Sequence, residues 1–253
     1  MVTARIALPA PSMSLTRLYL SFVIAAIAVM LAGIAHAGGS ATFVAGDNLS
    51  DPGAKSVRSR VEFDSARRVR VQADRVAGYL VVRDDAAYAV AEINGRPMVF
   101  DYAQAMATLG GLARSLAPPS LVTDGRFVNL TGPGRIETIA GLTGRVWLLT
   151  TVDKAGRERQ DELVLTPDPR ARELSDALLA TGRIVARALP ELDPQASERL
   201  ALELRNRGSG LLRVGNSFLL ERLDPATPPA TRFALPSAPM TVPDLGGLLG
   251  GVR

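Results

Sequence analysis

Cysteine is absent from this chain of 253 residues, and histidine occurs once, as His36. Without cysteine the protein has no disulfide, no thiolate nucleophile and no thiolate metal ligand. His36 lies in an N-terminal segment that we expect to be removed. Nucleophiles that rely on a histidine base are therefore excluded, as are zinc, copper and haem sites built on histidine or cysteine. We accordingly predict a protein that is not an enzyme, with no catalytic residue, no metal site and no cofactor.

Lysine is nearly absent too, since Lys55 and Lys154 are the only two. Positive charge is carried by arginine, and 29 basic side chains against 25 acidic ones give a formal net charge of only +4. Such a balance does not favour a nucleic-acid partner. Hydrophobic residues make up 47% of the chain and charged residues 21%, which is typical of a folded protein with a hydrophobic core.

An apolar run over residues 18–34 carries no charged side chain. Arg17 precedes it, and the small-x-small sequence Ala35-His36-Ala37 follows it. A basic segment, an apolar segment and small residues in this order are typical of a secretory signal peptide. We therefore predict that residues 1–37 are a signal peptide, cleaved between Ala37 and Gly38, and that the mature protein is periplasmic.

The same segment leaves alternatives open. The apolar run is close to the shortest length that spans a bilayer, so an uncleaved segment would anchor the protein in the inner membrane, facing the periplasm. We expect the protein to contact a membrane only transiently, or through this segment if it is not cleaved. A lipid anchor on an N-terminal cysteine is excluded because there is no cysteine. Met1 and Met13 are both candidate start residues.

Apolar and charged residues alternate with a period of two after residue 57, which predicts half-buried strands. Asn94-Gly95 between two such runs predicts a two-residue hairpin turn. An alanine-rich stretch over residues 102–112 predicts a short helix. In the first half we expect strands at residues 57–64, 68–74, 78–83, 86–93 and 96–101.

The second half repeats the strand pattern and adds two longer helices. Asp168-Pro169 and Asp193-Pro194 each place a capping acid before a proline, which predicts helices over 170–189 and 195–206. Gly215-Asn216 predicts a last hairpin. We expect strands at residues 127–130, 135–140, 145–152, 157–166, 211–214 and 217–223. A proline-rich segment follows and ends in a glycine-rich stretch, 241–253, that we expect to be flexible.

These elements predict one α+β domain over residues 38–240, with a curved, mostly antiparallel sheet and helices packed on one face. A curved sheet covered on one side leaves a concave apolar surface that suits a ligand. The alternative is that the apolar side chains on this surface are ordinary core residues. The candidate lining residues are Tyr79, Val81, Tyr88, Phe100, Trp147 and Leu149.

Charged residues offer weaker candidates. Guanidinium groups at 67, 68, 70 and 75 would suit lipid phosphates, but the acids at 62, 64 and 74 in the same hairpin favour a neutralised outer face. Asp161 and Glu162 are neighbours on a strand and point to opposite faces, so they do not form a catalytic pair.

Several short segments together carry a resemblance to a known family. They are the strands at 79–83, 87–95 and 96–101, the Ile139-Ala140-Gly141 and Gly144-Arg145-Val146-Trp147 sequences, Asp161-Glu162 and Phe233-Ala234-Leu235-Pro236. The chain resembles uncharacterised exported proteins of Gram-negative bacteria related to the lipoprotein-localisation factors LolA and LolB. The resemblance implies an incomplete antiparallel barrel around a hydrophobic cavity that helices close and acyl chains enter. The two helices at 170–189 and 195–206 depart from that family and put lipoprotein transfer in doubt.

Three functions are consistent with this sequence. The first is an exported, non-enzymatic binding protein that holds a hydrophobic ligand, a lipid or an acyl-like group, in the concavity of the sheet. The second is an interaction or scaffold module of the cell envelope, with an envelope protein as partner and a core filled by its own side chains. A carboxylate-dependent hydrolase is a third alternative, and it would require two acids facing one pocket.

Overall fold

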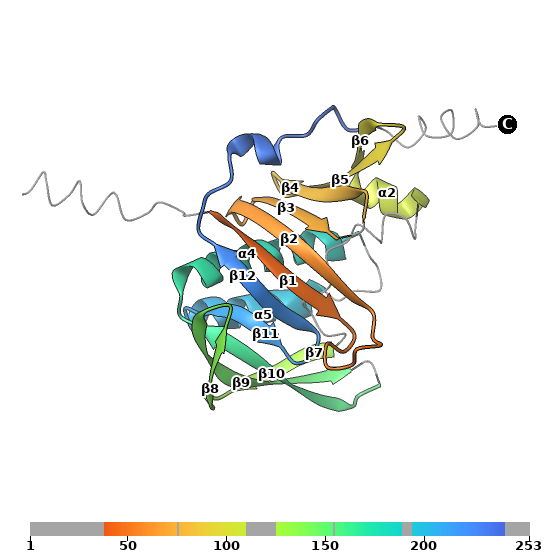
Figure 1. Ribbon diagram of the computed structural model, residues 1–253. Coiled ribbons are helices and arrows are strands. Elements are labelled where there is room, and N and C mark those ends of the chain that lie inside the picture. The colour runs from red at the N-terminus through yellow and green to blue at the C-terminus, as the bar shows by residue number, and fades with distance from the viewer. Residues whose placement is uncertain (1–37, 75, 110–124, 154, 189–193, 241–253) are drawn as a thin grey trace, which may run out of the picture. The chain divides into compact units, whose positions relative to one another are not determined.

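The computed structural model describes residues 38–74, 76–109, 125–153, 155–188 and 194–240. Within them the chain is α+β, with a mostly antiparallel sheet of twelve strands that does not close and a few helices packed against it (Figure 1). The predicted class is confirmed at this level.

The strands are β1 (Gly39–Gly46), β2 (Ser56–Ser65), β3 (Arg68–Ala73), β4 (Gly78–Arg83), β5 (Ala86–Ile93), β6 (Arg96–Asp101), β7 (Gly125–Thr131), β8 (Ile136–Ile139), β9 (Leu142–Asp153), β10 (Glu158–Thr166), β11 (Gly210–Val214) and β12 (Phe218–Asp224). The helices are α2 (Tyr102–Leu109), α4 (Pro169–Ala186), α5 (Pro194–Asn206) and the 3-10 turn η2 (Ala230–Phe233).

The first strand lies in the middle of the sheet. The strand order is β6-β5-β4-β3-β2-β1-β12-β11-β10-β9-β7, and β8 pairs with β9. The strands of the N-terminal half run from β1 to one edge, and those of the C-terminal half run from β12 to the other. Each half is a series of antiparallel neighbours, so β1 is the strand that joins the two halves.

The sequence analysis did not predict β1. Its residues alternate between buried and half-buried, with Ala41, Phe43 and Ala45 on the buried side. The rings of Phe43 and Phe218 lie 5.2 Å apart, one from each strand of the β1–β12 pair. Glycine, alanine and serine make up most of this strand. These residues have low strand propensity, so the sequence pattern did not predict a strand here.

The other predicted strands are confirmed to within a few residues, and the hairpin turns explain their register. Asn94 and Gly95 have φ values of 52° and 72°, the left-handed conformation expected of this two-residue turn. Asp84 and Asp85 adopt the same conformation between β4 and β5, with φ values of 53° and 63°. Aspartate tolerates this region better than most residues do.

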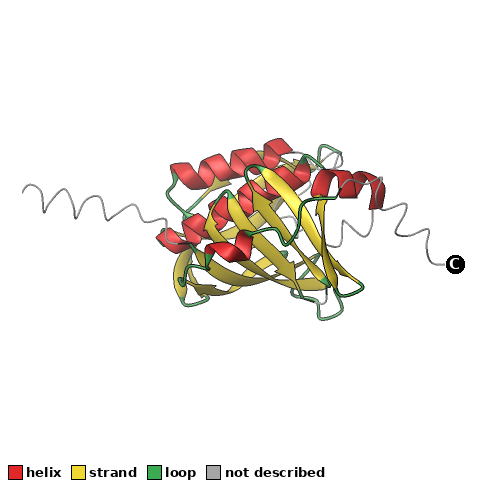
Figure 2. Cartoon of the chain, turned by 90° about the horizontal axis from the view of Figure 1, so that it is seen from above, coloured by secondary structure: helices red, strands yellow, loops and turns green. Residues whose placement is uncertain are grey.

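Two helices cover one face of the sheet, which we call the inner face (Figure 2). The α4 helix begins as predicted, with Pro169 in its first turn and the Asp168 carboxylate accepting a hydrogen bond from the Arg170 N–H at 2.9 Å. It buries Leu174, Leu178 and Val185 in the same hydrophobic cluster as the inward side chains of the strands. The α5 helix packs against α4 and β7, and α2 against β5 and β6. The cap predicted at Asp193 lies outside the described residues.

Close backbone contact fixes α4 to the sheet at the start of β11. The Ser175 hydroxyl donates to the Ala171 carbonyl at 2.7 Å and accepts from the Leu211 N–H at 2.7 Å. A Cβ atom at Gly210 would lie 2.4 Å from the Ala171 oxygen, so any larger residue would force the helix away. Glycine at this position therefore sets how closely α4 approaches the sheet.

The proline-rich segment contacts the sheet at a few positions, although most of its residues are exposed. Residues 225–240, which we call the strap, run from the end of β12 across β3 and β4 to β6 (Figure 1). Phe233 is buried, Arg232 binds Glu62 at 2.8 Å, and the Met240 N–H donates to the Val99 carbonyl at 2.8 Å. The strap thus covers part of the face opposite the helices, the outer face. The glycine-rich stretch predicted to be flexible lies outside the described residues.

The central position of β1 leads to a first prediction. Replacing Phe43 with alanine should lower the free energy of unfolding by about 3–5 kcal/mol, because it removes a fully buried ring where the two halves meet. Thr42→Ala, one residue away on the outer face, should cost less than about 1 kcal/mol. Urea titration of the two variants measures both values, and similar losses would contradict the central role of β1.

Candidate functional site

The six predicted ligand-lining residues fall on opposite faces of the sheet. Phe100 and Leu149 are buried in the inner cluster, and Trp147 packs against that cluster. Tyr79, Val81 and Tyr88 belong to a separate small cluster on the outer face. The structure therefore brings the residues together in two groups of three rather than around one concavity.

The inner group lies in a filled core. Leu149 pairs with Leu130 across β9 and β7, and both are buried. The Trp147 ring is covered by the Arg207 guanidinium, 4.6 Å from the ring centroid, and a Cβ atom at Gly132 would lie 2.9 Å from that ring. The inner group is therefore packed against other residues of the same chain.

The outer group lies under the strap. Val81 is directly opposite Tyr88, and Val90 is opposite Val99 on the neighbouring strands. Leu235 of the strap packs on this cluster. The Arg70 guanidinium stacks on the Tyr79 ring at 3.8 Å, and burial lowers the pKa of Arg70, a shift to which nearby Arg232 contributes. The outer group is thus also covered, by the C-terminal segment.

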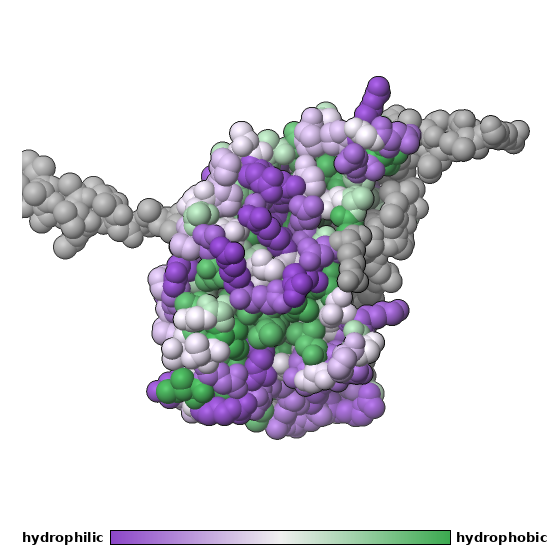
Figure 3. All heavy atoms as spheres, in the orientation of Figure 1, coloured by the Kyte–Doolittle hydropathy of each residue, from purple (hydrophilic) through white to green (hydrophobic). Residues whose placement is uncertain are grey.

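The middle of the outer face carries an apolar patch that no described helix or loop covers. Figure 3 shows apolar side chains gathered over the central strands and surrounded by hydrophilic ones. Val44 and Leu219 are direct partners at outward, half-buried positions of β1 and β12. We define these two residues as the central patch. Arg58 is the partner of Val44 on β2, and Arg213 is the partner of Leu219 on β11, so each side of the patch ends in an arginine.

Both arginines belong to ion pairs. Arg58 binds Glu221 through two hydrogen bonds of 2.7 Å. Arg213 belongs to a network in which it contacts Glu137 and Glu162 at 3.1 and 3.0 Å, while Arg135 contacts the same two carboxylates at 2.9 and 2.7 Å. Hydrogen bonds from Arg135 and Arg213 lower the pKa of Glu162 to about 2. The patch is therefore rimmed by charged groups held in fixed positions.

The arginines near the β2–β3 turn are neutralised, as the sequence suggested. Arg68 binds Asp64 at 2.9 Å and Arg67 binds Asp85 at 3.0 Å. With Arg83 they line a shallow groove of about 470 Å³ beside the strap, where Asp84 binds Arg83 at 3.3 Å. Each of these three arginines is therefore paired with an aspartate. Arg75 lies outside the described residues.

The two neighbouring acidic residues of β10 pair with different arginines. Asp161 pairs with Arg159 at 3.0 Å, and Glu162 pairs with Arg135 across the sheet. They share no partner. In the described part of the chain there is no group of three or more side chains that could hold a metal ion.

Comparisons of this chain with family models, with curated proteins and with solved structures find no match. The likeness to LolA and LolB therefore stays a prediction. Gly38 lies directly before β1 and is buried against the backbone of Phe63 and Asp64, while Ala37 lies outside the described residues. No helix in the described ranges has the length and apolar character needed to cross a membrane.

The Glu162 network leads to a prediction about pH. The folded pKa near 2 lies below the ordinary value of 4.5, so the charged carboxylate stabilises the fold above about pH 4.5 and this stabilisation is lost as the pH falls toward 2. Glu162→Gln should lower the free energy of unfolding at pH 6 by about 1 kcal/mol, a modest amount because water screens a side chain that is 37% exposed. The difference from the unsubstituted protein should shrink as the pH approaches 2.5.

Urea titrations at pH 6, 4 and 2.5 measure this difference. Glu92→Gln, at an exposed position near the end of β5, is the matched control and should change little at any pH. A destabilisation by Glu162→Gln that stays constant over this range would show that the carboxylate charge is not what stabilises the network.

Proposed function

We propose that this chain is a non-enzymatic interaction module of the cell envelope, exported by its N-terminal segment, that binds a protein partner with the outer face of its sheet. The observation that carries the proposal is the contrast between the two faces. The inner face is filled by α4, α5 and α2, whereas the central patch on the outer face is uncovered by any described helix or loop. A partner is the natural cover for such a patch.

Packing energies favour this function over the binding of an acyl chain in the concavity. An acyl chain would have to displace α4, which buries four large apolar side chains at about 1.5–3 kcal/mol each, or about 6–12 kcal/mol in all. Association adds a cost of about 4–15 kcal/mol. A chain of about sixteen carbons would regain about 13 kcal/mol, which exceeds the sum of these two costs only at their lowest values. The buried side chains concerned are Leu174, Leu178, Leu179 and Val185.

The charged rim would give the interface its specificity. Interfaces commonly combine an apolar centre with a polar rim, and arginine is enriched in them. The Arg58–Glu221 pair and the Arg213 network present charges of both signs on either side of Val44 and Leu219. A partner with its own apolar centre and charges of the opposite arrangement would match this pattern, while one with like charges would be repelled.

Site-specific photo-crosslinking in the native host tests this proposal. A photoreactive residue at position 42, beside the central patch, should form one discrete protein adduct. The same residue at position 202, on the exposed side of α5, is the matched control and should form at least tenfold less of that adduct. Leu219→Ser should also reduce the adduct at position 42 at least tenfold, because it removes half of the apolar centre.

Two outcomes would contradict the proposal. One is an adduct at position 42 that Leu219→Ser leaves unchanged, provided that this variant unfolds at the same temperature as the unsubstituted protein. The other is a stoichiometric acyl-containing adduct on the mature protein in native mass spectrometry, with no protein crosslink. The second outcome would favour a hydrophobic ligand between α4 and the sheet.

A further inference from the structure

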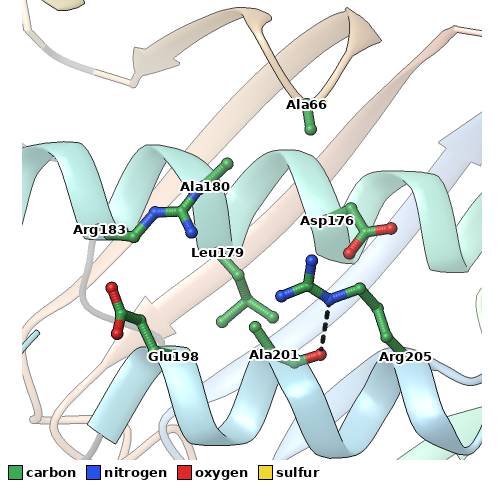
Figure 4. Close-up of a pocket in the computed structure, with 8 residues that line it drawn as sticks. All are labelled: Ala66, Asp176, Leu179, Ala180, Arg183, Glu198, Ala201 and Arg205. Carbon is green, nitrogen blue, oxygen red and sulfur yellow. Dashed lines mark hydrogen bonds between the residues drawn. The ribbon is translucent and has the colours of Figure 1, made fainter. Parts of the chain in front are cut away.

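A small hollow lies between α4 and α5, on the side of the molecule away from the central patch. It has a volume of about 180 Å³. Ala180 and Leu179 of α4, Ala201 of α5 and Ala66 of the β2–β3 turn line its apolar part (Figure 4). Small residues on both helices keep the hollow open, because longer side chains at these positions would fill it.

Four charged side chains surround this apolar part, two from each helix. Asp176 and Arg183 come from α4, and Glu198 and Arg205 come from α5. Figure 4 shows Asp176 beside Arg205 at one end of the hollow and Glu198 beside Arg183 at the other. Each end therefore offers one carboxylate and one guanidinium.

These four groups do not neutralise one another by direct contact. Within the described residues none of them forms an ion pair within 4.0 Å, and the one hydrogen bond that any of them donates runs from Arg205 Nε to the Ala201 carbonyl at 3.2 Å. Several other arginines of this chain do bind carboxylates, at 2.7–3.4 Å, as in the Arg58–Glu221 and Arg222–Asp224 pairs. Burial raises the pKa of Asp176, although Arg205 and Arg172 act against the shift. The donors and acceptors at both ends are thus available to a ligand.

The spacing of the charges defines the chemistry of that ligand. Asp176 and Arg183 are seven residues apart on one helix, which places their backbones about 10 Å apart along its axis. An extended dipeptide spans about 7 Å between its ends, and the long side chains at the rim lean over the hollow to cover the rest. A hollow of about 180 Å³ suits a dipeptide with small side chains and not an acyl chain.

We propose that the hollow between α4 and α5 binds a short zwitterionic peptide of dipeptide size, with its ammonium group on Asp176 at one end and its carboxylate on Arg183 at the other. Hydrogen bonds between charged groups are the stronger kind, and a guanidinium binds a carboxylate in a bidentate manner. The side chains of the peptide would lie on Leu179, Ala180 and Ala201. This site is independent of the central patch and of any partner there.

Isothermal titration calorimetry of residues 38–253 with alanyl-alanine tests the site. We expect binding of alanyl-alanine, and at least tenfold weaker binding of its N-acetyl form, which lacks the ammonium group, and of its C-terminal amide, which lacks the carboxylate. Free alanine, which carries both charges but cannot span the hollow, should also bind at least tenfold more weakly. Stronger binding of free alanine than of the dipeptide would overturn the assignment to a peptide.

Variants of the lining residues test the location. Arg183→Gln and Asp176→Asn should each weaken the binding of alanyl-alanine at least tenfold. Arg199→Gln, an exposed arginine of α5 that does not line the hollow, is the matched control and should change binding less than twofold. Thermal unfolding identifies any variant that fails to fold, and Ala180→Gln then serves as a second variant that fills the hollow without removing a charge. Absence of dipeptide binding at millimolar concentration, or equal binding by all variants, would overturn the proposal.

Discussion

The pairing of β1 with β12 is the contact on which the rest of this structure depends. The first strand of the sheet inserts between β2 and the last strand, so the two halves share one sheet only when the start and the end of the domain meet. Ala41 pairs with Val61 on one side and with Leu223 on the other. Loop-closure entropy opposes such a distant pairing, and buried Phe43 against Phe218 supplies the apolar contact that offsets it. In a chain without disulfides, this contact has no covalent substitute.

The position of α4 follows from the same sheet and decides which surfaces are open to other molecules. Gly210 and Ser175 hold the start of the helix directly against β11, and the apolar side of the helix then fills the concavity. Because the concave face is core in the part of the chain that the structure describes, the surfaces that we propose for binding lie outside it. Those surfaces are the outer face of the sheet and the side of the helix pair that faces away from the sheet. Both proposed binding sites therefore lie on the surface of the protein, outside its filled core.

Much of the fold was predictable from the sequence, and the errors have physical causes. Strands with arginine at every second position were predictable, because apolar and charged residues alternate clearly in them. The β1 strand was missed because its alanine and glycine residues do not show such an alternation. The six candidate residues were grouped wrongly, although the signal to separate them was present. A two-residue turn at Asn94-Gly95 pairs Ile93 with Arg96, which puts Phe100 opposite Ala89 and therefore on the face opposite Tyr88. The register of the β5–β6 hairpin, deduced from its turn, would have placed Phe100 and Tyr88 on different faces of the sheet.

The hollow between the helices could not be found in the same way. Asp176, Ala180 and Arg183 recur at helical spacing, as do Glu198, Ala201 and Arg205, but each pattern alone is that of an ordinary solvated helix face. The two helix faces line one hollow because α4 packs against α5, and the sequence does not show this packing. The same helix therefore contributes to both the stability and the surface chemistry of the protein. Its apolar side closes the core, and its charged side, brought opposite α5, provides groups of both signs that form no ion pair with one another or with other described residues.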